Sequence, residues 1–282
     1  MNLIKAERKN EELLASVEAH RAEPEGFQLW WLGQSGYLVQ WQGKKFLLDP
    51  YLSDSLTKKY LQTDKPHTRM SELVIDPAAF RDILFVTSSH NHTDHLDAET
   101  LVPILNNNPD IRFIIPEANR AFVAERVGST PGFPAGLNEK QSLEIEGFRI
   151  TGVPAKHNEV DRDEQGNCRY MGYVIQFGGY SIYHSGDTLW LDDIIDQVRP
   201  FSVDLALLPI NGNDPARKVA GNLNVKEAAE MGKALGATTV IPCHYDMFTF
   251  NTADVKDFVK AATDLGQGHT VLSGGGLFTF KK

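Results

Sequence analysis

Residues 83–97 read ILFVTSSHNHTDHLD, an apolar segment of strand character that runs into a loop rich in histidine and aspartate. The loop places His90, His92, Asp94 and His95 within six positions. Imidazole binds zinc, iron and manganese, and a carboxylate adds a harder oxygen ligand. A solvated polar loop is the alternative interpretation, but nine histidines spread over 282 residues would rarely place three so close together. The segment therefore predicts a metal site at the end of a strand.

Three later segments place a metal-binding residue type directly after an apolar strand. PAKHNEV contains His157, YHSGDT contains Asp187 and VIPCHYD contains His244. Each is weak evidence alone, because a single histidine after a strand is more often a surface or core residue. Their joint occurrence with the loop at 90–95 favours one shared site. A single zinc takes about four ligands, so this larger set indicates two metals.

Segments of strand and helix character alternate along the chain from Gly26, which predicts an α/β class or a layered mixture. No stretch resembles a linker, so we expect one domain over 1–282, with 1–25 as an N-terminal helical extension. The N-terminal helix would carry Leu13, Leu14 and Val17 on one side. The expected strands include 27–33, 36–41 and 44–50, the expected helices are 97–107, 117–127 and 224–236, and 52–75 is expected to be a flap or loop.

Two stretches of the chain resemble each other. GYLVQWQGKKFLLDP begins at Gly36, and GYVIQFGGYSIYHSGDT begins at Gly172; each has strand, glycine turn, strand and then an aspartate, Asp49 or Asp187. Any β-hairpin with a glycine turn looks like this, so the similarity has two interpretations. The other interpretation is a repeated α/β half, with two sheets packed face to face and strand ends meeting along one edge.

The composition narrows the possible partners. The formal net charge of −9 is unfavourable for a general nucleic-acid binder, which needs a basic surface. No apolar run approaches the ~18 residues of a membrane span, and the N-terminus lacks the continuous apolar stretch of a secretory signal. Two cysteines are too few for a disulfide framework. We therefore expect a cytoplasmic protein with a small-molecule substrate, no nucleic-acid partner and no stable membrane insertion; a homo-oligomer is compatible with the sequence.

The combined motif, His-x-His-x-Asp-His followed by a histidine, a GDT aspartate and a histidine, resembles the metallo-β-lactamase-fold hydrolases. The resemblance implies a four-layer αββα sandwich with two divalent metal ions. It implies that His90, His92 and His157 hold the first metal, that Asp94, His95 and His244 hold the second, and that Asp187 bridges both. Zinc, manganese and iron all accept such a ligand set. A metal-activated hydroxide would then be the nucleophile, with Asp94 as the catalytic carboxylate that contacts it.

Two subgroups of that superfamily are similar to this chain. WWLGQSGYLV, VIDPAAFRDILFVTSSHNHTDHLD, YHSGDT and ALGATTVIPCHYDMF are similar to the L-ascorbate 6-phosphate lactonase group, whereas SHNHTDHLD, GDT and ALLPI also resemble the N-acyl phosphatidylethanolamine phospholipases D. The resemblance implies a lactonase that acts on a small anionic, sugar-phosphate-like lactone. A phosphodiesterase of the phospholipase D type is the first alternative, and a non-catalytic metal-binding protein is the second.

The remaining candidates are residues that orient ligands or contact substrate. Asp49 and His184 are expected to stand behind the metal ligands. The expected substrate contacts are Asn211, Asn213, Arg217, Tyr245 and Lys156. Arg217 suits a phosphate or carboxylate, although an ordinary surface arginine is the alternative. We interpret Cys243 as a packing residue, because His244 takes the ligand position beside it.

Overall fold

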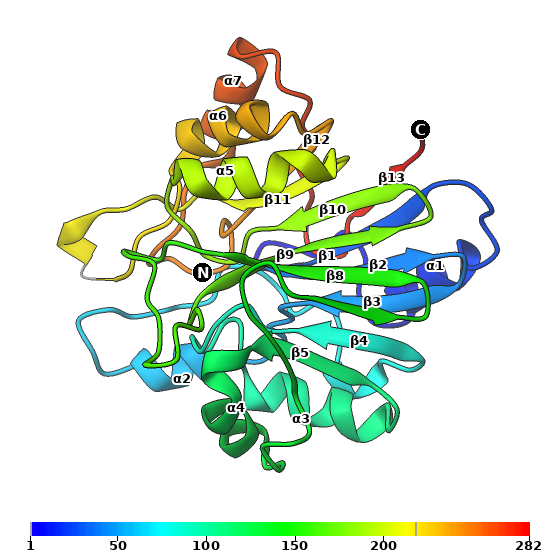
Figure 1. The fold of residues 1–282 in the computed structure, drawn as a ribbon. Helices are drawn as coiled ribbons and strands as arrows, with labels where there is room; N and C mark the ends of the chain where they lie inside the picture. The colour runs from blue at the N-terminus through cyan, green and yellow to red at the C-terminus, as the bar shows by residue number, and fades with distance from the viewer. Residues whose placement is uncertain (1, 218) are drawn as a thin grey trace.

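The computed structural model describes residues 2–217 and 219–282, whose strands form two mixed sheets packed face to face (Figure 1). The helices are α1 (Glu11–Ala19), α2 (Ser55–Tyr60), α3 (Ala98–Asn107), α4 (Arg120–Val127), α5 (Asp192–Val198), α6 (Val225–Leu235) and α7 (Val255–Asp264). The strands are β1 (Phe27–Gly33), β2 (Gly36–Trp41), β3 (Lys44–Leu48), β4 (Ile83–Thr87), β5 (Arg112–Pro116), β6 (Ala135–Leu137), β7 (Ser142–Ile145), β8 (Phe148–Pro154), β9 (Met171–Phe177), β10 (Tyr180–His184), β11 (Leu205–Pro209), β12 (Thr239–Cys243) and β13 (Leu277–Phe280).

The two sheets repeat one pattern of strand directions. The first has the order β13-β1-β2-β3-β4-β5-β6 and the second β12-β11-β10-β9-β8-β7. In the first, β1, β2 and β3 are antiparallel neighbours, and β4 and β5 then add in parallel. In the second, β8, β9 and β10 are antiparallel, and β11 and β12 add in parallel. The two similar stretches of sequence are therefore the hairpins β2–β3 and β9–β10, which occupy equivalent positions in the two sheets.

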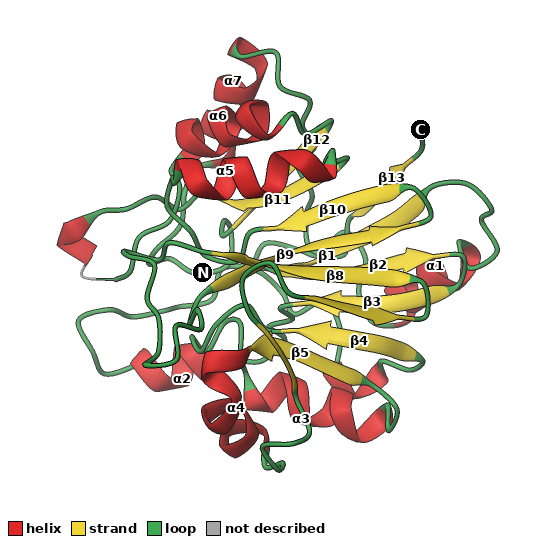
Figure 2. Ribbon diagram, in the orientation of Figure 1, coloured by secondary structure: helices red, strands yellow, loops and turns green. Residues whose placement is uncertain are grey.

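Helices cover the outer face of each sheet, which confirms the predicted αββα sandwich (Figure 2). Strand β1 shows why both faces of a sheet are buried. Leu29 and Trp31 pack into the core between the sheets, whereas Trp30 and Leu32 pack towards the helices of the first sheet. Side chains alternate across a strand, so a continuous apolar run serves two cores at once.

The predicted helices correspond closely to observed ones. Helix α6 begins with a capping box: the Asn224 side chain accepts from the Glu227 N–H, and the Glu227 carboxylate accepts from the Asn224 N–H. The helix ends at Gly236, which has a left-handed backbone.

At the N-terminus, Leu13 is buried as expected, but Leu14 is 38% exposed, because consecutive helical positions point about 100° apart.

The segment 52–75 was expected to be a flap or loop, and the structure corrects this by placing the short helix α2 within it. A small apolar cluster of Tyr51, Leu56, Met247 and Phe248 fixes this helix against the C-terminal part of the chain. Isolated helices of this length are unstable in water, so tertiary contacts rather than local propensity account for α2.

Over the described ranges, no helix combines the length and the apolar character that crossing a bilayer requires.

Candidate metal centre

The predicted metal-binding residues all lie at strand ends along one edge of the sandwich. His90, His92, Asp94 and His95 follow β4, and the remaining three residues follow β8, β10 and β12. Parallel strands deliver their carboxyl ends to the same edge, where binding sites of open sheets form. Their ligand atoms make two groups, each within 4.8 Å: His90, His92, His157 and Asp187, and separately Asp94, His95 and His244.

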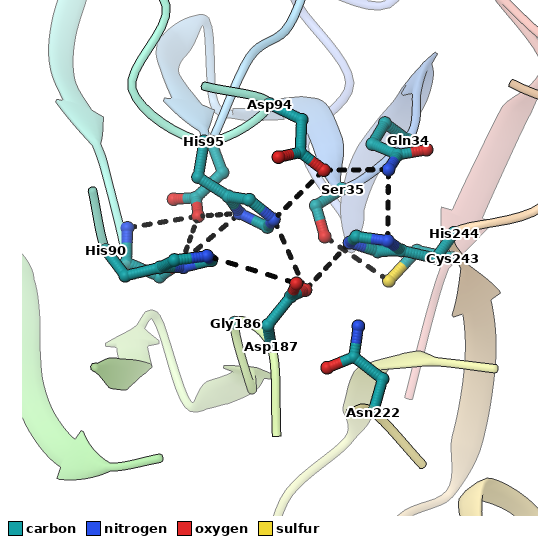
Figure 3. Close-up of polar contacts among 12 residues, drawn as sticks. Gln34, Ser35, His90, Asp94, His95, Gly186, Asp187, Asn222, Cys243 and His244 are labelled. Atoms are coloured by element: carbon teal, nitrogen blue, oxygen red, sulfur yellow. Dashed lines mark hydrogen bonds and ion pairs between the residues drawn. The ribbon is translucent and has the colours of Figure 1, made fainter. Parts of the chain in front are cut away.

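Asp187 lies between the two groups, and its two oxygens face different histidines (Figure 3). Its Oδ1 is 2.8 Å from His244 Nε2 and 3.2 Å from His95 Nε2. Its Oδ2 is 3.6 Å from His157 Nε2 and 3.9 Å from His90 Nε2. Burial opposes ionisation of Asp187, but the neighbouring His244 and His95 outweigh it and hold the pKa well below its usual value. Asp187 is therefore an ionised carboxylate in the middle of the cluster.

Several buried polar atoms of the cluster have no hydrogen-bond partner among the described residues. These atoms are His90 Nε2, His95 Nε2, His244 Nε2 and Asp187 Oδ1; the last two lie 2.8 Å apart as an ion-pair contact, but without the geometry of a hydrogen bond. Buried polar groups are nearly always satisfied, because an unsatisfied one costs about 1–3 kcal/mol. Imidazole nitrogens and carboxylate oxygens that converge without hydrogen bonds are the donor set of a divalent transition metal. The residues present therefore fit a metal centre.

In His95 and His157, the hydrogen bond made by Nδ1 determines which ring nitrogen can bind a metal. His95 Nδ1 is 2.7 Å from Asp49 Oδ2, and His157 Nδ1 is 2.8 Å from the Gly221 carbonyl oxygen. A carboxylate and a carbonyl only accept, so both Nδ1 atoms carry the proton and donate it. In the neutral form of each imidazole, the lone pair is thereby left on Nε2, on the side that faces Asp187.

Asp49 organises the loop that contains the metal-binding motif. Its Oδ2 accepts from the Ser89 N–H at 3.0 Å as well as from His95, and its Oδ1 accepts from Thr87 Oγ1 at 2.7 Å. Burial opposes ionisation of Asp49, but His184, His95 and Ser89 outweigh it and lower the pKa to about 2. Asp49 is therefore a buried anion that orients His95, which is the position expected for it.

His184 stands one layer further from the cluster. Its Nε2 donates to the Ser35 carbonyl oxygen at 3.1 Å. Burial lowers the pKa of His184 itself. Cys243 is also buried, and desolvation raises the pKa of its thiol far above the usual value. A thiol of this kind is unreactive, in keeping with its interpretation as a packing residue.

Gln34 is a site residue that the sequence reasoning did not single out. Its Nε2 is 2.8 Å from Asp94 Oδ2 and 3.0 Å from His244 Nδ1 (Figure 3). One amide thus connects the carboxylate of the β4 loop to the histidine that follows β12. The turn GQSG between the first two strands could have indicated Gln34, because a polar residue in this turn lies beside the carboxyl ends of the parallel strands.

The backbone is strained where it supplies the cluster. Gln34, Asp49 and His244 all have positive φ values, of 51°, 37° and 62°. Non-glycine residues rarely adopt this conformation, and such strain gathers at functional sites. Gly186 has φ 59°, and a Cβ there would lie 2.6 Å from the Met171 carbonyl oxygen. The glycine of the GDT segment is therefore required for the close approach of β10 to β9.

The cluster opens into a cavity of about 300 Å³. His92 and Asp94 are the more exposed members of the cluster, whereas His90, His95, His157, Asp187 and His244 are buried. Part of the cavity wall comes from α2 and the segment after it, and the lining residues there are Leu56, Lys59, Tyr60, Lys65 and His67. Sequence reasoning missed this wall, since it assigned no role to the polar residues of 52–75.

The five residues expected to contact substrate do not line this cavity. Tyr245 is a core residue that stacks on Trp31 and donates its hydroxyl to the Leu272 carbonyl oxygen. Asn213 is exposed, and Lys156 is half-buried outside the lining. Position in the chain beside a ligand residue was a poor guide, because neighbouring side chains need not point in the same direction.

Arg217 and Asn211 have a supporting position instead. Arg217 donates to Asn251 Oδ1 at 2.8 Å and to the backbone carbonyl oxygens of Asn211 and Gly212 at 2.7 and 3.0 Å. Asn211 Nδ2 is also bound to Asn251 Oδ1, at 2.9 Å. Asn251 lines the cavity. The two predicted substrate contacts therefore hold a lining residue in place.

Comparisons with known proteins agree with this geometry. Residues 44–245 match the family described as "Beta-lactamase superfamily domain". The chain is 30% identical to a "UPF0173 metal-dependent hydrolase" of Methanosarcina mazei, over 82% of this chain and 88% of the relative. It is 25% identical to a "Probable L-ascorbate-6-phosphate lactonase" of Shigella dysenteriae, over 86% of this chain and 75% of the relative. A solved metallo hydrolase of Ignicoccus hospitalis has the same fold, with a TM-score of 0.68 at 22% identity, covering 91% of this chain and 99% of that one.

Replacement of Asp49 by asparagine tests its role in orienting His95. We expect Asp49→Asn to fold but to bind zinc about 10–100-fold more weakly, because the neutral amide no longer holds the proton on His95 Nδ1 as a carboxylate does. Zinc affinity is measured by competition with a chromogenic chelator. Asp110→Asn, at an exposed position, is the matched control and should bind as the unsubstituted chain does. Equal zinc affinity in both variants would contradict the assignment.

Proposed function

The chain belongs to the β-lactamase superfamily, and from this we propose that it is a metal-dependent hydrolase that opens a small lactone carrying an anionic group. The observation that carries the proposal is the convergence of buried imidazole and carboxylate atoms without hydrogen bonds, next to a cavity that Asp187 lines. A metal-dependent hydrolase and a probable lactonase among the relatives support it.

We assign the metal-binding residues to two positions. His90, His92 and His157 would hold one divalent ion, and Asp94, His95 and His244 the other. The two oxygens of Asp187 face different histidine sets, which suits a carboxylate shared between the ions. Zinc or manganese fits these ligands, as does iron. When bound, such ions act as Lewis acids towards a carbonyl oxygen and make water more acidic.

Asp94 is the chain's own group best placed to handle a proton. It is partly open to the cavity, and its Oδ2 is held by Gln34 Nε2. Burial opposes its ionisation, but His95 and His244 outweigh burial and lower the pKa of Asp94. In the reaction, a water oxygen bonds to the lactone carbonyl carbon and the ring C–O bond breaks. Asp94 Oδ2 accepts the water proton and returns it to the departing ring oxygen, so that a hydroxy acid is released.

The cavity supports a small substrate. About 300 Å³ is at the lower end of the range for small-molecule sites, and the lining is mostly polar. An N-acyl phosphatidylethanolamine carries long acyl chains that need an apolar surface, so the phospholipase D alternative has less support. The non-catalytic alternative also has less support, because the cluster is complete and opens to a cavity.

Substrate class is tested with two reporter reactions. The metal-loaded chain should hydrolyse 6-phosphogluconolactone with a higher kcat/KM than bis(p-nitrophenyl) phosphate, because the proposed chemistry is attack on a carbonyl. Initial rates are measured by pH-stat for the lactone and by absorbance for the diester. A preference for the diester would overturn the lactonase assignment, and absence of turnover of either would overturn the proposal of a hydrolase for these substrate classes.

Metal stoichiometry is a separate test. We expect about two divalent ions per chain, because the candidate ligands form two groups around Asp187 and a single tetrahedral site takes about four ligands. Elemental analysis follows purification without chelator and loading with zinc or manganese. One equivalent or less after loading would contradict the two-ion assignment.

Asp94→Ala separates proton transfer from binding. We expect kcat to fall by about 10²–10³-fold, with a much smaller change in KM, because a group that moves a proton acts mainly in the transition state. Steady-state kinetics are measured on a variant whose metal content matches that of the unsubstituted chain, since Asp94 is also an assigned ligand. Asp193→Ala, on the exposed surface of α5, is the control and should leave kcat unchanged. An unchanged kcat in Asp94→Ala would remove Asp94 from the mechanism.

A further inference from the structure

The cavity wall formed by α2 carries positive charge. Helix α2 contains two adjacent lysines that point to different surroundings. Lys58 Nζ forms an ion pair with Glu99 Oε2 at 2.8 Å and does not line the cavity. Lys59 lines the cavity, and its Nζ is 3.4 Å from Thr93 Oγ1. Thr93 stands between His92 and Asp94, so the Lys59 ammonium lies beside the metal-binding loop.

Lys59 is not neutralised by a carboxylate. Over residues 2–217 and 219–282, no aspartate or glutamate oxygen lies within 4.0 Å of its Nζ, whereas Lys58 has Glu99. An anion that enters the cavity therefore meets an ammonium that contacts the Thr93 hydroxyl and the Tyr60 ring and is not already paired with a carboxylate. A lysine ammonium is a point charge that binds phosphate oxygens well.

The wall that carries Lys59 is held in a fixed position. Arg69 pairs with Asp54 Oδ1 at 2.6 Å and donates to the Ser53 carbonyl oxygen, which ties the start of α2 to the end of the following segment. The Leu56 N–H donates to the Tyr51 hydroxyl at 3.0 Å. Such anchoring lowers the entropic cost of presenting a charge to a ligand.

A neutral imidazole accompanies Lys59 on the same wall. His67 lines the cavity, its ring packs against Tyr60 and Phe248, and its Nδ1 donates to the Lys65 carbonyl oxygen at 2.8 Å. Burial lowers the pKa of His67 and outweighs the Lys65 carbonyl oxygen and Asp94, which raise it. With Nδ1 engaged, Nε2 is the nitrogen that can accept a hydrogen bond from a hydroxyl group. Charge and hydrogen-bonding capacity together suit a hydroxylated anion such as a sugar phosphate.

We propose that Lys59 binds the phosphate monoester of the substrate at the cavity wall formed by α2, beside the metal-binding loop, and so determines the preference for phosphorylated over neutral lactones. The inference rests on the proposed function, since it places the reacting lactone ring towards Asp94 and the phosphate towards α2. It also replaces Arg217 and Lys156, the cations expected from the sequence, because neither lines the cavity.

The first experiment compares Lys59→Gln with Lys58→Gln in the metal-loaded full chain. The substrates are 6-phosphogluconolactone and gluconolactone, which differ by one phosphate. We expect the ratio of their kcat/KM values to fall about tenfold in Lys59→Gln, mainly through KM, which is the scale of one charge-assisted hydrogen bond at a partly exposed position. Lys58→Gln should keep the ratio, because the Lys58 ammonium is paired with Glu99 and does not line the cavity. An unchanged ratio in Lys59→Gln overturns the proposal.

The second experiment measures binding without turnover, so that the two proposals can fail separately. Isothermal titration calorimetry follows 6-phosphogluconate and gluconate on the metal-stripped and the metal-loaded chain. Tighter binding of the phosphorylated acid that is lost in Lys59→Gln and kept in Lys58→Gln supports the phosphate site, even when no lactone is hydrolysed and the proposed function fails. Equal binding of the two acids, or no binding of either, overturns the phosphate site, even when lactone hydrolysis is found.

Discussion

A buried carboxylate surrounded by imidazoles is the constraint around which this molecule is organised. Asp187 is almost fully buried, and it stays ionised because His244 and His95 face it. Four separate strand ends must meet at one edge to surround it, and this requires two sheets in fixed register. The left-handed backbone at Asp49 and His244 is a cost of that convergence. The extensive apolar packing between the sheets is what can hold such a strained, charged centre together.

The parts of the site that could be predicted from sequence are those encoded locally. Asp94 and its three neighbouring histidines share one loop, and a strand before that loop already determines their direction. Asp49 was expected behind the metal ligands, and the structure places its Oδ2 2.7 Å from His95 Nδ1. The predicted helix 224–236 is encoded locally as well, since its start and stop signals lie within its own sequence. No long-range information was needed for these features.

The substrate wall could not be predicted, because it depends on tertiary contacts. Lys58 and Lys59 are identical in type and adjacent in sequence, and only the packing of α2 decides which one faces the cavity. Arg217 looked suitable by chemistry, yet the Asn211 and Gly212 carbonyl oxygens and the Asn251 side chain occupy its guanidinium. Tyr245 follows a ligand residue but turns into the core. Such outcomes follow from side-chain direction, which residue spacing does not encode.

The anchoring of α2 has a consequence for how this scaffold can diversify. Arg69, Asp54 and Ser53 close the segment 53–69 on itself, and the segment packs on Tyr51 and Phe248. The strand ends that carry the chemistry belong to other parts of the chain. Recognition and reaction are therefore separable modules, so a graft of this one segment from a relative could redirect substrate choice while the reactive centre is inherited intact.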